Sequence, residues 1–342
     1  MRVLIIGGTG NISSEFASTA IARGMEVYIL TRGNSVPSAG AAALKADAGD
    51  PASVAQAIRG MNFDAVVDFL CYQPERAAEA IDSFLGRTGQ YVFISSASVY
   101  EKPPRSHVID EKTQLCNPFW PYARDKIACE RLFMDAFHDR GFPVTIVRPS
   151  HTYGHSWIPT AFVSSDFTVA ARMLEGREII VPGDGQSLWT LTHARDFSTG
   201  LVGLLGRPEA LGEAFTIAGD DVHTWDAIHR IVADALGVEA RIVHIPSEFI
   251  AAVDAAMGER LLGDKAYSSL FDCSKLRRLV PDFRTTIPLA RGVEESVAWR
   301  FAEPARMAVN GEMDERIERI LSAWYKAMAT TRGMATVDQR SV

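Results

Sequence analysis

The 342-residue chain lacks the features that mark membrane proteins and secreted proteins. No apolar stretch reaches the roughly 18 residues that a membrane-spanning helix needs, and the amino-terminal residues do not have the layout of a signal peptide. We therefore expect a cytoplasmic protein that does not associate with a membrane.

The chain also has few cysteines and fewer basic than acidic residues. The four cysteines are widely spaced, with no CxxC pair and no cysteine–histidine cluster, which predicts reduced thiols and no metal site. The formal net charge of −7 at pH 7 disfavours a nucleic-acid partner, because nucleic-acid binding depends on basic patches. The partner that we expect is a small molecule.

The first half of the chain contains a regular alternation of strand-like and helix-like segments. The strand-like segments are almost continuously apolar, and the segments between them have the spacing of amphipathic helices. This pattern predicts an α/β fold with a Rossmann-like, doubly wound parallel sheet. The predicted strands are 3–6, 27–30, 65–69, 91–94 and 144–147, and the predicted helices are 15–23, 52–59, 75–85 and 122–140.

The second half has shorter segments that are rich in proline, glycine and tryptophan. We predict a dinucleotide-binding domain over residues 1–155, with a return segment at about 190–222. Residues 156–189 and 223–325 would form a smaller, mixed α/β substrate-binding region. Ligands of doubly wound sheets bind at the carboxyl ends of the strands, so this region would close over that edge.

A glycine-rich loop, Gly-Gly-Thr-Gly-Asn-Ile-Ser, follows the first predicted strand and precedes a predicted helix. Gly7 would permit the tight turn, Gly10 would let backbone amides approach a pyrophosphate, and the helix N-terminus would favour its negative charge. Ser13 stands where the usual pattern has a third glycine. The loop predicts a dinucleotide site whose contacts are Gly7, Thr9, Gly10, Asn11 and Ile12.

The end of the second predicted strand bears on the choice between NAD and NADP. Thr31 stands where an acidic residue would bind the ribose hydroxyls of NAD, and the next residue, Arg32, could accommodate the 2′-phosphate of NADP. Arg32 favours NADP over NAD, unless it is only a solvated surface residue. Asp47 follows the predicted third strand, where it could accept a hydrogen bond from the adenine, and Ala48 lies beside it.

A serine cluster and a YxxxK pattern predict the chemistry. Residues 95–100, Ser-Ser-Ala-Ser-Val-Tyr, end a predicted strand, and Tyr122 and Lys126 share one face of a predicted helix. A tyrosine with a pKa of about 10 is a poor base, but a neighbouring ammonium favours its phenolate form. A strand-end serine could hold the substrate oxygen during hydride transfer.

With these motifs the chain resembles the extended short-chain dehydrogenase/reductase family, which includes nucleotide-sugar epimerases and dehydratases. The resemblance covers about residues 1–300, with the motifs at 7–13, 95–100, 122–126 and 148–154. It implies that Tyr122 is the catalytic acid/base, that Lys126 binds the nicotinamide ribose and tunes Tyr122, and that Ser96 is the catalytic serine. Further residues implied to lie at the cofactor or substrate are Phe69, Leu70, Pro149 and, as a helper of Ser96, Ser98. It also implies a homodimer through the helices at 75–85 and 122–140.

The departures from the family pattern concern the substrate. Family dehydratases carry Asp-Glu after the catalytic residue, where this chain has Ala97-Ser98, so elimination of water is disfavoured. Trp189 stands where nucleotide-sugar enzymes offer an arginine to the diphosphate; it cannot replace that ligand but could stack on a sugar or a base. His151 stands where epimerases often carry asparagine, as a second proton donor or as a structural histidine.

Three functions follow as alternatives. The first is an NAD(P)-dependent epimerase that oxidises a hydroxyl of a sugar-like substrate and reduces the ketone from its other face. The second is a net NADP-dependent reductase or dehydrogenase of a small carbonyl substrate, which the sequence hardly separates from the first. The third is a dinucleotide-sensing or RNA-binding protein, because the glycine loop and Thr31-Arg32-Gly33 are also similar to chloroplast stem-loop-binding proteins. The acidic balance and the set of Ser96, Tyr122 and Lys126 weigh against this third function.

Overall fold

The structure is a computed structural model that describes residues 1–34 and 37–338. The chain divides into two compact units. Unit 1 comprises residues 1–154, 190–222 and 269–292, and unit 2 comprises residues 155–189, 223–268 and the described chain from 293 onward. That one part binds a dinucleotide and the other a substrate stays a prediction.

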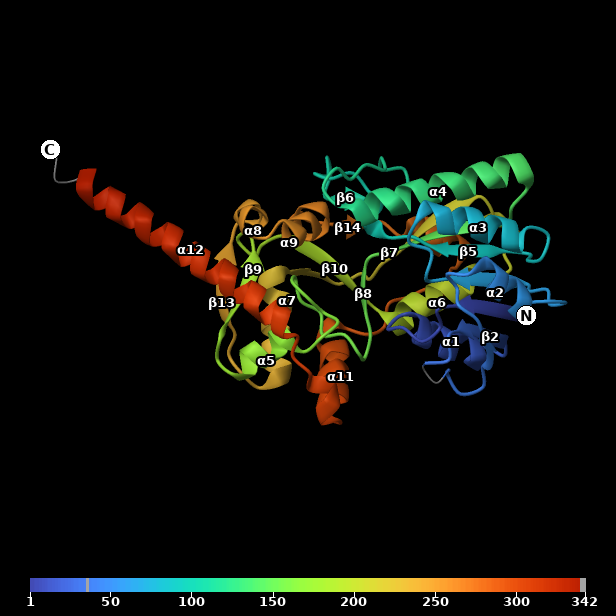
Figure 1. Cartoon of the computed structure of the whole chain (residues 1–342), viewed down its shortest axis with the longest axis horizontal. Coiled ribbons are helices and arrows are strands. Elements are labelled where there is room, and N and C mark those ends of the chain that lie inside the picture. Colours follow the sequence, from blue (N-terminus) through green and yellow to red (C-terminus); the bar gives the residue numbers. More distant parts are fainter. Residues whose placement is uncertain (35–36, 339–342) are drawn as a thin grey trace. The chain divides into compact units, whose positions relative to one another are not determined.

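Within the described residues, unit 1 is built on a seven-stranded sheet in the order β11-β7-β5-β4-β1-β2-β3. Figure 1 labels β2, β5 and β7 of this sheet. Every pair in it runs parallel. The strand order reverses at β1, which lies between β2 and β4, and this confirms the predicted doubly wound, Rossmann-like fold. The strands are β1 (Arg2–Ile6), β2 (Glu26–Thr31), β3 (Ala42–Lys45), β4 (Ala65–Asp68), β5 (Tyr91–Ile94), β7 (Val144–Pro149) and β11 (Glu213–Ile217).

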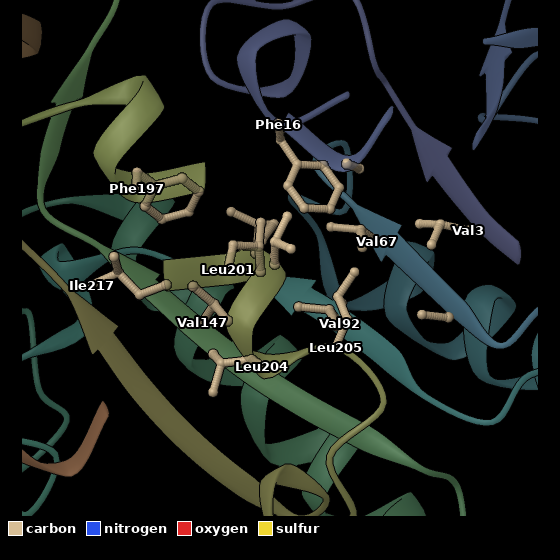
Figure 2. Close-up of a cluster of buried hydrophobic side chains, with 14 of the residues drawn as sticks. Val3, Phe16, Val67, Val92, Val147, Phe197, Leu201, Leu204, Leu205 and Ile217 are labelled. Carbon is tan, nitrogen blue, oxygen red and sulfur yellow. The ribbon is translucent and has the colours of Figure 1, made fainter. Parts of the chain in front are cut away.

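Helices cover both faces of this sheet because its central strands are apolar on both sides. Val3 and Ile5 of β1 belong to one hydrophobic cluster, whereas Leu4 and Ile6 belong to the other. Figure 2 shows the first cluster, in which Phe16 and Phe197 lie over the strand residues. The helices on that face are α1 (Ser13–Ala22) and α6 (Ala194–Leu204), and those on the other are α2 (Pro51–Ala57), α3 (Pro74–Phe84) and α4 (Pro121–Arg140).

The remaining elements of unit 1 are short. They are η1 (Ala97–Val99), β6 (Val108–Ile109) paired with β14 (Leu270–Phe271), β8 (His151–Tyr153), η2 (Pro208–Ala210) and α10 (Ser274–Leu279). Strand β8 pairs in parallel with β10 (Leu188–His193). Three elements have residues in both units: β10, β12 (Val222–Thr224) and α11 (Leu289–Phe301).

Unit 2 contains a parallel pair of strands, β9 (Glu178–Pro182) and β13 (Arg241–Ile245), with helices packed around it. This composition confirms the predicted smaller, mixed α/β region. The helical elements are α5 (Thr168–Leu174), α7 (Trp225–Leu236), α8 (Ser247–Val253), α9 (Ala255–Arg260), η3 (Leu261–Lys265), η4 (Pro304–Met307) and α12 (Gly311–Asp338).

The helices expected to form a dimer interface, α3 and α4, pack against each other. On α4, Phe133 and Ala136 are buried among the residues of the sheet, and Ala128 and Leu132 are half-buried. Phe133, Ala136 and the partly buried Leu132 therefore pack within the chain itself. The homodimer stays a prediction.

A buried ion pair joins α4 to β7. Arg148 donates from Nε to Oε1 of Glu130 at 3.0 Å and from Nη2 to Oε2 at 2.6 Å. The two side chains are 6% and 4% exposed, respectively. Ser95 donates to the same Oε1 at 2.5 Å, and Arg148 donates from Nη1 to the Tyr100 hydroxyl at 3.2 Å. These added bonds offset the cost of removing both charges from water.

We predict that Glu130→Gln lowers the free energy of unfolding by about 3–5 kcal/mol, because it leaves the Arg148 guanidinium buried without a counter-charge. Urea unfolding of the purified protein measures this. The control is Asp82→Asn, which breaks the exposed Arg140–Asp82 pair on α3 and α4 and should cost less than about 1 kcal/mol. Equal losses in the two variants would contradict a structural role for the buried pair.

Candidate active site

The predicted functional segments of unit 1 lie at one edge of its sheet. The glycine loop follows β1, Phe69 follows β4, the serine cluster follows β5, and Pro149 ends β7. Because these strands are parallel, their carboxyl ends meet at the same edge. The topology therefore brings together segments that are far apart in the sequence.

The serine cluster forms a short turn, η1, and Ser96 accepts hydrogen bonds at its start. The Ser96 Oγ accepts a bond from the Ser98 backbone N–H at 3.1 Å and another from the Ser98 hydroxyl at 2.9 Å. Ser98 is buried, whereas Ser96 is only half-buried. Because Ser96 accepts both of these bonds, its own hydroxyl hydrogen is left to donate to a substrate oxygen.

Lys126 lies one helical turn after Tyr122 and is 1% exposed. Its Nζ donates to the carbonyls of Cys71 and Ile94, each at 2.7 Å, so α4 is tied to the ends of β4 and β5. Burial lowers the pKa of Lys126 to about 8. The Nζ also lies 4.7 Å from the ring centre of Tyr72.

Tyr122 begins the first turn of α4, directly after Pro121, a residue suited to the first helical position. Its ring lies 4.7 Å from that of Trp120 and is half-buried. The Lys126 ammonium is 5.8 Å from the centre of the Tyr122 ring.

The amide of Asn117 joins the serine turn to the start of α4, a role that no sequence motif indicated. Its Nδ2 donates to the Ser98 carbonyl at 2.8 Å, and its Oδ1 accepts from the backbone N–H groups of Phe119 and Trp120, each at 3.2 Å. A single buried side chain thereby positions Ser98 against the residues that precede Tyr122. The Asn117-Pro118 pair indicates a turn at this position but not the bonds of the amide.

Asp68, at the end of β4, is a second residue whose role no sequence motif indicated. Its carboxylate accepts from the N–H groups of Leu70 and Cys71 at 2.7 and 3.1 Å and from the Tyr91 hydroxyl at 2.6 Å. Burial raises the pKa of this carboxyl group. Asp68 therefore shapes the turn that presents Leu70 and the carbonyl to which Lys126 binds.

The glycine loop fits a dinucleotide. Gly7 has φ +84°, and a β-carbon there would lie 2.5 Å from Cγ of Leu70, which is 41% exposed beside the loop. Ser13 donates to the Gly7 carbonyl at 2.5 Å and accepts from the Gly10 N–H at 2.9 Å. The hydroxyl that replaces the third glycine thus closes the loop. The positive φ of Gly7 gives the tight turn with which the glycine loop of a dinucleotide-binding fold begins.

The other predicted cofactor residues lie along the same edge. Thr9 and Arg32 are exposed, whereas Asn11, Ile12 and Thr31 are half-buried. Phe69 packs on Phe16 at a ring distance of 5.9 Å. The Asp47 carboxylate accepts from the Gly49 N–H at 2.9 Å, and Ala48 is half-buried. That these residues contact a cofactor stays a prediction.

The predicted substrate residues have different surroundings. His151 begins β8 in unit 1 and is half-buried. Trp189 belongs to unit 2, is 2% exposed and packs on Trp225 at a ring distance of 5.3 Å. Its indole nitrogen has no hydrogen-bond partner among the described residues. The structure gives Trp189 the surroundings of a core residue, and its contact with a substrate stays a prediction.

Two arginines of unit 2, Arg172 and Arg177, pair with carboxylates of α12. Arg172 donates to Asp314 at 2.6 Å and to Glu318 at 2.8 Å, and Arg177 donates to the same two carboxylates. These bonds hold α12 to α5 and to the segment that follows it.

Two classes of feature are not found in the described part of the chain. No three histidine, cysteine or acidic side chains there are grouped so that they could hold a metal ion. No helix within residues 1–34 and 37–338 is long and apolar enough to cross a membrane.

Comparison with known proteins identifies a family and a fold. A model of the NAD dependent epimerase/dehydratase family matches residues 3–218. The chain is similar to the 2′-dehydrokanamycin reductase of Streptomyces kanamyceticus, with 26% identity over 83% of this chain and 80% of the reductase. It is also similar to the chloroplast stem-loop binding protein of 41 kDa b of Arabidopsis thaliana, with 28% identity over 72% of this chain and 67% of that protein.

Among solved structures, the chain is similar in fold to the UDP-glucuronic acid 4-epimerase of Bacillus cereus in complex with UDP-glucuronic acid and NAD. The TM-score is 0.71 and the sequence identity is 17%, over 88% of this chain and 99% of the epimerase. This likeness extends the comparison to the fold of both units.

We predict that the free energy of unfolding of the unmodified protein, minus that of Lys126→Met, rises between pH 8 and about 10.5. The rise is up to about 3 kcal/mol. The folded pKa of Lys126, about 8, lies below its ordinary 10.5, so the unfolded chain binds more protons in this window and unfolding becomes less favourable as pH rises. Urea unfolding at several pH values measures the difference. Lys112→Met, which removes an exposed ammonium, is the control, and a pH-independent difference for Lys126→Met would refute the lowered pKa.

Proposed function

The chain belongs to the NAD-dependent epimerase/dehydratase family and is an enzyme of the short-chain dehydrogenase/reductase type, and from this we propose that it is an epimerase of a sugar or sugar-like substrate. Its reaction would be hydride transfer at a carbon that alternates between hydroxyl and ketone, with Tyr122 as the acid/base. The observation that carries this proposal is the buried Lys126 ammonium, 5.8 Å from the Tyr122 ring and bound to the end of β5, which the serine cluster follows.

Each residue of the set would have a separate task. Ser96 donates its hydroxyl hydrogen to the substrate oxygen, as its bonds from Ser98 allow. Tyr122 takes the proton from that oxygen during oxidation and returns one during reduction. Lys126 stabilises the phenolate through its charge. The chemistry that a bound nicotinamide supplies is the acceptance and return of hydride.

Dehydratase chemistry has less support. Elimination of water from a keto sugar needs an acid and a base close to the substrate. The residues that follow Ser96 are Ala97 and Ser98, both buried in the η1 turn and neither a carboxylic acid. The turn therefore offers proton transfer to one substrate oxygen and no second proton shuttle.

A net NADP-dependent reductase is the second candidate. The similarity to a reductase over 83% of the chain supports it, and so does Arg32, which is exposed at the end of β2, where a 2′-phosphate would lie. The two candidates share Ser96, Tyr122 and Lys126. They differ in whether the cofactor is regenerated on the enzyme or exchanged after each turnover.

We infer a cytoplasmic homodimer as the form of the enzyme. All four cysteines are free thiols, which suits a reducing compartment. The packing of α3 against α4 supplies the helix pair through which a dimer could form. The substrate that we expect is carbohydrate-like, with or without a nucleotide.

The candidates are separated by identifying the cofactor that the purified protein retains and by measuring its binding of NADPH and of RNA. Protein purified without added cofactor is denatured, and released dinucleotides are identified by mass spectrometry. Retained NAD or NADP supports the epimerase, whereas an empty site that NADPH fills readily supports the reductase. Salt-sensitive RNA binding without dinucleotide binding or turnover would instead favour an RNA-binding protein, as the similarity to the stem-loop binding protein suggests.

We predict that Tyr122→Phe lowers kcat by about 10²–10⁴-fold, because it removes the acid/base, while the Kd of the cofactor changes little. Turnover is measured on a panel of nucleoside-diphosphate sugars and of sugar ketones without a nucleotide. Tyr325→Phe, which alters an exposed tyrosine of α12, is the control and should retain full activity. An unchanged kcat in Tyr122→Phe would exclude Tyr122 as the acid/base.

A further inference from the structure

We propose that Lys45 is a second ligand for the 2′-phosphate of NADP and that, with Arg32, it makes the site select NADP over NAD. The inference deepens the proposed function and rests on it, since it presumes a dinucleotide at the glycine loop. Lys45 was not among the cofactor residues predicted from the sequence.

The sheet register places Lys45 beside the loop that carries Arg32. Strands β2 and β3 are parallel neighbours, and Thr31 lies opposite Lys45 at their carboxyl ends. Arg32 is the first residue after β2. The two cationic side chains therefore belong to adjacent strand ends at the edge of the sheet where a cofactor of this fold binds.

Gly33 brings the loop against the stem of Lys45. The Gly33 N–H donates to the Thr31 hydroxyl at 3.3 Å, which turns the chain directly after the strand. A β-carbon on Gly33 would lie 3.6 Å from Cε and 3.7 Å from Cδ of Lys45. The alkyl stem of the lysine thus runs alongside the residue that follows Arg32, and Gly33, at φ +89°, has the backbone conformation that this turn needs.

The charges of Arg32 and Lys45 are uncompensated. Both side chains are exposed, and neither forms an ion pair with any residue in the described ranges. At the other end of β2, by contrast, Arg2 pairs with Glu26 at 3.2 Å. The loop of residues 31–34 contains no acidic residue. In a chain of net charge −7, two unpaired cations at one strand edge indicate an anionic ligand.

The chemistry of the two side chains matches a phosphate monoester. Such a group carries a charge of about −1.5 to −2 at neutral pH, which two cations can balance. An arginine can bind phosphate oxygens bidentately, and a lysine contributes a mobile point charge. The uncharged 2′-hydroxyl of NAD offers neither side chain a charged partner, so the pair discriminates between the cofactors through the phosphate alone.

The test compares the Kd of NADPH with the Kd of NADH in Lys45→Met. Methionine keeps an unbranched stem against Gly33 and removes the ammonium. We expect the Kd of NADPH to rise about tenfold and the Kd of NADH to stay unchanged. Adenosine 2′,5′-bisphosphate should lose affinity in the same proportion and 5′-AMP should not, and Lys112→Met, with the same change in net charge, should alter neither cofactor.

Two outcomes would overturn the role of Lys45 and leave the proposed function standing. One is an equal change in the Kd of NADPH and of NADH in Lys45→Met, and the other is tighter binding of NADH than of NADPH by the unmodified protein. Failure of the unmodified protein to bind either dinucleotide would overturn the proposed function, and the role of Lys45 with it. The outcomes are distinguishable because affinity for both cofactors is measured in every variant.

Discussion

The buried ion pair between Glu130 and Arg148 is the constraint on which the arrangement of the candidate active site depends. Glu130 lies one turn beyond Lys126 on α4, and Arg148 precedes Pro149 at the end of β7. The carboxylate also accepts the hydroxyl of Ser95, the residue before Ser96. Three segments that meet the carboxyl edge of the sheet are therefore held by one pair of charges. An apolar contact could bring them equally close, but it would not fix their direction, because dispersion forces have little angular preference.

Lys126 gives the site its electrostatic character. Its burial disfavours the ammonium, yet a pKa of about 8 leaves the charged form dominant at neutral pH. The charge is supported by two carbonyls and by the faces of Tyr72 and Phe93, with ring centres at 4.7 and 4.8 Å. None of these direct partners is a carboxylate, but the nearby charges of Asp68 and Glu130 raise the pKa of Lys126 and so also favour its charged form.

The fold, and the positions of the main candidate residues within it, were predictable because they depend on local patterns. Unbroken apolar strands between amphipathic helices define a doubly wound sheet, and a helix places Tyr122 and Lys126 on one face through its own geometry. Asn117 and Asp68 were not predictable, because each acts through contacts with backbone groups that only the folded chain brings near. The surroundings of Trp189 depend on Trp225, which is distant in the sequence. Motif position indicated where Trp189 stands in the chain but not how deeply it is buried.

The two bonds of the Lys126 ammonium have a consequence for how this enzyme could change over evolution. Both acceptors, at Cys71 and Ile94, are main-chain carbonyls, which every residue type possesses. Substitutions at these two positions can alter the apolar surroundings of the site while the lysine keeps the same partners. A mutagenesis library can therefore introduce diversity at these two positions while the acceptors of the lysine remain in place.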